Sequence, residues 1–88
     1  MGKVLAIMKI MPEDANEPID DLRQRIDQSL EGKVHIEAWE KIPIFGPLHA
    51  LRLRFIVDDK TGGTAFVEDI IRKVNGVGEI EIEAVSLI

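Results

Sequence analysis

The sequence predicts an α+β fold in which strands and helices follow in the order β-α-β-β-α-β. Four segments alternate apolar and polar residues with the period of a strand. Two further segments, placed after the first and third strands, carry apolar residues at helical spacing. The chain has 88 residues and 45% apolar content, enough for one compact core. We therefore expect a single domain over residues 1–88.

The first strand and first helix have clear boundaries. Residues 3–11 (KVLAIMKIM) predict the strand, and apolar side chains on both of its faces place it in the middle of a sheet. Pro12 ends it. A helix follows Pro18, because proline suits a first helical turn, and stops at Gly32. Its apolar stripe consists of Ile19, Leu22, Ile26 and Leu30.

The second and third strands flank an apolar loop. Residues 33–42 predict a strand with one buried and one mixed face, and residues 49–58 show the clearest alternation in the chain. In the second strand we expect Val34, Ile36 and Ala38 inside, and His35, Glu37, Trp39 and Lys41 on the mixed face. In the third strand, Leu51, Leu53, Phe55 and Val57 alternate with Arg52 and Arg54.

The second helix and last strand complete the pattern. Thr61-Gly62-Gly63-Thr64 predicts a helix start with Thr64 as the N-cap, and Asn75-Gly76 predicts its end. Its inner side consists of Phe66, Val67, Ile70, Ile71 and Val74. Residues 79–85 alternate glutamate with apolar residues, which predicts a fourth strand with its isoleucines facing inward.

This element order corresponds to the ferredoxin-like sandwich, in which both helices cover one face of a four-stranded antiparallel sheet. The opposite, open face of the sheet, which no helix covers, then carries charged and apolar side chains. Pairs of Arg or Lys with Glu on neighbouring strands there contribute some tenths of a kcal/mol each to stability. We expect the open face to hold Leu5, Ile7, Lys9, Arg52, Arg54, Glu79, Glu81 and Glu83, with Trp39 as a further candidate.

Composition argues against several functions that this fold supports. The chain has no cysteine, which excludes disulfides and cysteine-based metal sites, and a cytoplasmic location fits. A net charge of −5 opposes direct binding of nucleic acids. His35 and His49 have no third ligand at metal-like spacing. Ser29 and Ser86 lie in no nucleophile motif, so we expect no enzyme, cofactor or metal. No segment approaches the roughly 20 apolar residues that span a bilayer.

The loop between the second and third strands, Ile42-Pro43-Ile44-Phe45-Gly46-Pro47-Leu48, is unusually apolar. Large apolar side chains in a loop either fold back on the core or contact another molecule, and two prolines lower the entropy of holding one shape. The loop therefore indicates a preformed contact for a partner protein, although Ile44 and Leu48 could instead pack under the edge of the sheet.

The chain resembles the archaeal translation elongation factor 1-beta family from end to end. The matching motifs are Met1-Gly2-Lys3-Val4, Lys9-Ile10-Met11-Pro12-Glu13, Ile42-Pro43-Ile44, Leu48-His49-Ala50-Leu51 and Asn75-Gly76-Val77. The resemblance implies a guanine-nucleotide exchange factor that binds elongation factor 1-alpha, in its GDP-bound and nucleotide-free forms, and promotes exchange of GDP for GTP.

In relatives, the loop between strands two and three and the end of the last strand press on the GTPase. The resemblance thus implies partner contacts at Pro43, Ile44, Phe45, Gly46, Pro47, Leu48, His49, Ser86, Leu87 and Ile88. This chain departs from the family at two of these positions: Phe45 stands where many relatives have a small residue, and Leu87 stands where eukaryotic relatives have a lysine.

A second function remains open at this point, namely a regulatory module of the same fold that binds a small ligand or dimerises. A monomer is one expectation for the oligomeric state, but Leu5 and Ile7 on the open face leave pairing of two copies open.

Overall fold

The computed structural model describes residues 2–88, so Met1 lies outside the described residues, and so does the side chain of Thr61. The element order is the predicted β-α-β-β-α-β, with a short 3₁₀ helix before the second α-helix. The elements are β1 (Lys3–Pro12), α1 (Ile19–Leu30), β2 (His35–Phe45), β3 (Leu48–Asp58), the 3₁₀ helix (Asp59–Thr61), α2 (Gly63–Arg72) and β4 (Val77–Leu87).

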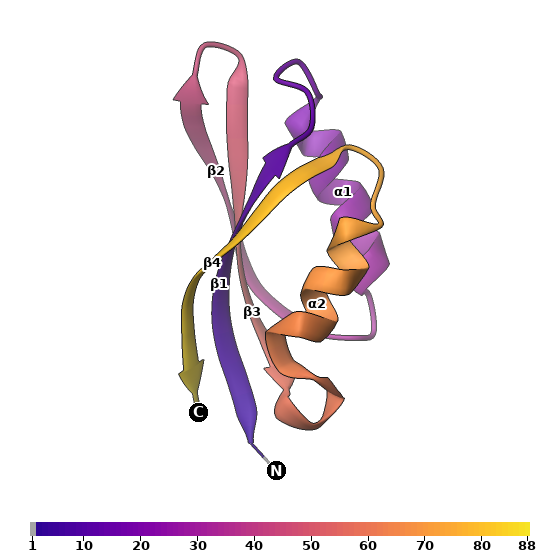
Figure 1. Ribbon diagram of the computed structural model, residues 1–88, viewed down its shortest axis with the longest axis vertical. Helices are drawn as coiled ribbons and strands as arrows, with labels where there is room; N and C mark the ends of the chain where they lie inside the picture. Colours follow the sequence, from indigo (N-terminus) through magenta and orange to yellow (C-terminus); the bar gives the residue numbers. More distant parts are fainter. Residues whose placement is uncertain (1) are drawn as a thin grey trace.

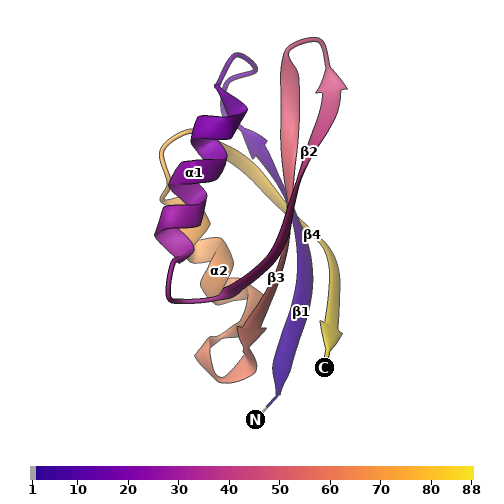
Figure 2. The same ribbon diagram turned by 180° about the vertical axis from the view of Figure 1, so that it is seen from behind.

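The four strands form one antiparallel sheet in the order β2-β3-β1-β4. Both helices cover the same face of the sheet, as Figures 1 and 2 show from opposite sides. The strand order confirms the ferredoxin-like prediction, including the central position of β1. The molecule is elongated, measuring 42 × 20 × 17 Å, and the β2–β3 hairpin and the two termini lie at opposite ends of its long axis (Figure 1).

The core lies between the sheet and the helices. β1 alternates buried and half-buried residues from Val4 to Pro12, and in β3 every second residue from Leu51 to Val57 is buried. The predicted helix stripes are confirmed: Leu22, Ile26 and Leu30 of α1 and Val67 and Ile71 of α2 are fully buried. Ile19, Phe66, Ile70 and Val74 pack against this core while partly exposed. Alternation and helical spacing thus identified the inner faces of these four elements.

The predicted apolar loop is shorter in the structure than in the prediction. β2 continues to Phe45 and β3 begins at Leu48, so Gly46 and Pro47 alone form the turn of a long hairpin. Gly46 has a φ of +56°, a left-handed conformation that glycine adopts without steric cost. The residues around it pair across the hairpin as Pro43 with His49 and Phe45 with Leu48, so this proline-containing stretch is part of the two strands.

The prediction for the second half of β2 was wrong because β2 contains a bulge. Ile36 pairs with Phe55, whereas Ala38 pairs with Arg54, so the register shifts by one residue between them. A one-residue shift moves every following side chain to the other face. Trp39 therefore pairs with Leu53 and packs on the helix side of the sheet, while Ala38 lies on the open face.

The start of α2 also differs from the prediction. The N-cap is Gly62, with a φ of +106° and no side-chain hydrogen bond, and Thr64 lies inside the helix. The polar exit from β3 forms the 3₁₀ helix instead, where the carboxylate of Asp58 accepts a hydrogen bond from the backbone N–H of Lys60. The helix thus begins two residues earlier than it would with Thr64 as its N-cap.

Candidate functional site

The tip of the β2–β3 hairpin is the first predicted contact segment. Its pairs are Pro43 with His49 and Phe45 with Leu48, separated by a register irregularity at Ile44. The side chain of Phe45 is 82% exposed and that of Ile44 is 40% exposed, while Leu48 and His49 are half-buried. The tip therefore presents one aromatic ring to the surroundings, and Leu48 contributes more to the hairpin itself.

His49 takes part in the structure of the turn. Its Nδ1 lies 3.1 Å from the carbonyl oxygen of Pro47. Because a carbonyl oxygen only accepts hydrogen bonds, Nδ1 carries the proton and donates it. In the neutral ring, Nε2 is then an acceptor, and the imidazole supports the hairpin tip from one side.

The second predicted contact segment, Ser86 to Ile88, ends the outer strand β4. Leu87 pairs with Val4 and Ser86 with Leu5, and the backbone N–H of Ile88 donates to the carbonyl oxygen of Lys3 at 2.9 Å. Although the backbone is tied to β1, the side chains of Leu87 and Ile88 are 73% and 63% exposed. A well-ordered backbone thus displays apolar side chains that the core does not use.

Val85 belongs to the same surface, and the sequence prediction missed it. Its side chain is 55% exposed and lies on the same face of β4 as that of Leu87. A signal existed, because the residues after Glu83 carry no Asp, Glu, Lys or Arg. We refer to Ala84–Ile88 as the tail.

Apolar exposure is confined to these two places. Within residues 2–88, the exposed large apolar side chains are Ile44 and Phe45 at the hairpin and Val85, Leu87 and Ile88 in the tail. Residues 42–51 contain no Asp, Glu, Lys or Arg, and neither does the tail, although 31% of the chain is charged. The hairpin tip and the tail lie at opposite ends of the molecule (Figures 1 and 2). The structure therefore does not bring the two predicted segments together, and they form two separate exposed apolar surfaces.

The open sheet face carries an ion-pair cluster centred on Arg52. Its guanidinium donates to both carboxylate oxygens of Glu83, at 2.7 and 3.3 Å, and to Glu40 at 3.1 Å. The hydrogen bond from Arg52 lowers the pKa of Glu83 below its ordinary value of 4.5. Hydrogen bonds to Glu83 and Glu40 raise the pKa of Arg52. The predicted pairing of cations and carboxylates on this face is thus confirmed for Arg52.

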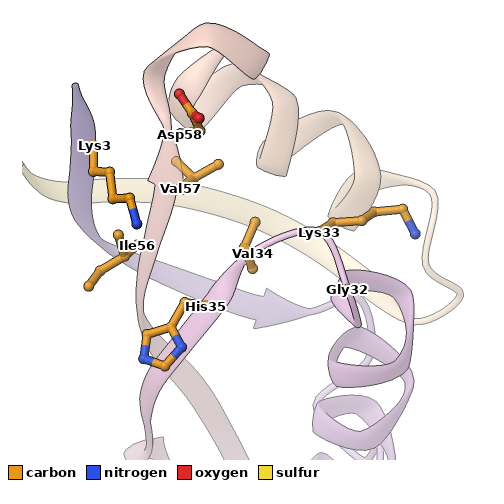
Figure 3. A pocket seen from close by; sticks show the side chains of 8 residues that line it. All are labelled: Lys3, Gly32, Lys33, Val34, His35, Ile56, Val57 and Asp58. Atoms are coloured by element: carbon orange, nitrogen blue, oxygen red, sulfur yellow. The ribbon is translucent and has the colours of Figure 1, made fainter. Parts of the chain in front are cut away.

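A cavity of about 400 Å³ lies near the tail end of the molecule, between β1, β3 and the segment that follows α1 (Figure 3). Its lining residues are Lys3, Gly32, Lys33, Val34, His35, Ile56, Val57 and Asp58. Lys33 extends away from its centre in Figure 3 and donates to the carbonyl oxygen of Ser29 at 3.3 Å. His35 is paired with Glu37 at 2.8 Å. Of the three basic residues that line the cavity, Lys33 and His35 thus contact other groups. The cavity offers no converging set of ligand-binding groups.

Among the described residues, no group of three or more His, Asp or Glu side chains is placed to hold a metal ion. Residues 2–88 also contain no helix long and apolar enough to cross a membrane.

Comparison with known proteins identifies the family of the chain. The family model for the EF-1 guanine nucleotide exchange domain matches residues 5–88. Elongation factor 1-beta of Desulfurococcus amylolyticus is 40% identical over 87 residues, which is 98% of this chain and 97% of that protein. Elongation factor 1-beta of Thermoplasma acidophilum is 38% identical over 88 residues, the full length of both chains. The chain therefore belongs to the EF-1 guanine nucleotide exchange domain family and is a nucleotide exchange factor of translation elongation, with no covalent chemistry of its own.

Proposed function

We propose that the domain engages elongation factor 1-alpha through both ends of its long axis, with the hairpin tip and the tail each contacting a separate surface of the GTPase. The observation that carries this proposal is that, within residues 2–88, the exposed large apolar side chains all lie at these two uncharged ends. Exposed apolar groups on an otherwise charged surface are typical of protein contacts.

The physical basis of exchange requires contacts of this kind and no reactive side chain. An exchange factor that binds the nucleotide-free GTPase more tightly than the GDP-bound form lowers the affinity for GDP by the same factor. Phe45 at one end, and Val85, Leu87 and Ile88 at the other, supply binding free energy by leaving water. We place this activity in the cytoplasm, where translation occurs.

The tail has Leu87 at the position where eukaryotic relatives carry a lysine. Leu87 occupies that position and is 73% exposed, so its contribution is apolar packing and not a positive charge near a metal or phosphate group. The contact surface for the tail on the GTPase is therefore expected to be apolar as well.

The test is release of a fluorescent GDP analogue from purified elongation factor 1-alpha, with this protein added in catalytic amounts. Deleting Leu87 and Ile88, or replacing Phe45 with Ala, should each slow the stimulated release. A matched control is Arg72→Ala, because Arg72 is exposed on α2, away from both ends. If both end variants stimulate release as strongly as the unchanged protein, the contact surfaces lie elsewhere and the proposal is wrong.

A further inference from the structure

The fourth strand changes register immediately before the tail, and the residue at the change is Glu83. Met8 pairs with Ile82, but Ile7 pairs with Ala84, so Glu83 is the extra residue of a β-bulge. Bulges of this kind bend a strand and redirect the side chains that follow. β4 bends in its second half, where it leads to the C-terminal end (Figure 1).

The bulge decides which side chains the tail presents on each face. If the pairing of the first half of β4 with β1 continued without a bulge, Ala84 would pair with Ala6 and Val85 with Leu5. Val85 and Leu87 would then lie on the open face of the sheet. In the structure, Val85 pairs with Ala6 and Leu87 with Val4, so both lie on the helix side of the sheet. A shift of the register by one residue would replace Val85 and Leu87 on the helix side of the sheet with Ala84 and Ser86.

Arg52 is the residue that holds Glu83 at the bulge. It lies on β3, and its side chain crosses over β1 to reach Glu83 on β4 with two hydrogen bonds, at 2.7 and 3.3 Å. Glu40 on β2 accepts a third hydrogen bond at 3.1 Å and fixes the guanidinium from the other edge of the sheet. Planar, two-point contact of this kind is specific to arginine, because a lysine ammonium binds a carboxylate as a point charge.

We propose that Arg52 is a positioning residue for the tail: by pinning Glu83 at the bulge, it sets the register that directs Val85 and Leu87 toward the GTPase. This inference rests on the proposed function of the tail. In this proposal the ion pair acts on the tail side chains through the backbone of β4.

The test combines a register measurement with the exchange assay. Arg52→Lys keeps the charge but loses the two-point contact, and Glu83→Gln keeps the shape but loses the charge. Both should lower stimulated GDP release by up to about fivefold, the upper end of the effect expected for an exposed ion pair. Both should also speed hydrogen exchange at the Ile88 amide, which reports the pairing of the tail with Lys3. The double variant should be no worse than either single variant.

Glu81→Gln is the matched control, since Glu81 lies on the same strand and pairs with Lys9 within the regular register. It should leave both readouts unchanged. Normal GDP release by Arg52→Lys and Glu83→Gln, alongside lost release on deletion of Leu87 and Ile88, would overturn the positioning role and leave the proposed function intact. Unchanged release on that deletion would refute the tail contact, and the positioning role with it.

Discussion

Replacing Phe45 with Ala should weaken partner binding without weakening the fold, because Phe45 has the largest exposed fraction among the exposed large apolar residues of the described chain. The ring is at the hairpin tip and is 82% exposed, so the folded domain gains little from it. Substitutions at exposed positions usually change the free energy of unfolding by less than about 0.5 kcal/mol. We expect Phe45→Ala to leave the unfolding midpoint in urea close to that of the unchanged protein.

The effect on binding follows from the same exposed area. Complete burial of a phenylalanine side chain contributes about 1.5–3 kcal/mol. Since 82% of the ring is still exposed, contact with the GTPase can bury most of it, worth about 2 kcal/mol. Each 1.4 kcal/mol corresponds to a factor of ten, so the dissociation constant of the complex should rise about 30-fold.

The assay is titration of nucleotide-free elongation factor 1-alpha with each variant, followed by calorimetry, with Arg72→Ala as the matched control. A dissociation constant within about threefold of the unchanged protein would show that Phe45 stays exposed in the complex. A large loss of stability together with weak binding would equally refute the reasoning, because it would mean that the ring supports the fold.

Three further predictions concern the fold. Phe55→Ala, at a fully buried position in β3, should lower the free energy of unfolding by about 3–5 kcal/mol in urea titrations. Gly76→Ala should lower the thermal midpoint more than Gly32→Ala, although both glycines have positive φ. A Cβ at Gly76 would lie 2.7 and 2.8 Å from the side-chain ends of Glu17 and Arg25 and would displace their ion pair, whereas a Cβ at Gly32 meets no atom within 4 Å. Equal losses would contradict this reasoning. The unchanged protein should have a higher free energy of unfolding than Glu83→Gln, and this difference should be fully present above pH 4.5. It should disappear as the pH falls through the lowered pKa of Glu83 in the folded state, because protonation removes the pairing with Arg52. A difference that grows in acid would refute the pairing.

The regular part of the fold was predictable because each face of a regular element repeats at a fixed interval. Leu51, Leu53, Phe55 and Val57 alternate without interruption, and their burial follows directly. The helix stripes repeat in the same way. Such patterns need no knowledge of the partner strand, so one sequence is enough to identify them.

The irregular part depends on contacts between strands, which one sequence does not contain. The bulge after Ile36 moves Trp39 to the helix side, against the alternation that predicted it on the mixed face. The burial of Trp39 there leaves its indole N–H without a hydrogen-bond partner among the described residues. The bulge at Glu83 similarly places Val85 where simple alternation would not.

The candidate contact residues were identified mainly through family resemblance, supported by the absence of charge in both segments. Exposure refined this set, because Leu48 and His49 are half-buried while Phe45 and Leu87 are not. Which of these residues touch the GTPase stays a prediction.

If both ends contact the GTPase as proposed, the elongated sheet holds the two contacts at a fixed separation. β1 and β3, of ten and eleven residues, are hydrogen-bonded along most of their length, so the distance between the hairpin tip and the tail cannot adjust freely. Two linked contacts bind strongly only when the partner presents its surfaces at the matching separation. If the two contact surfaces of the GTPase change their separation between nucleotide states, the domain would bind most tightly to the state whose separation matches its own length. It would then favour that state without touching the nucleotide.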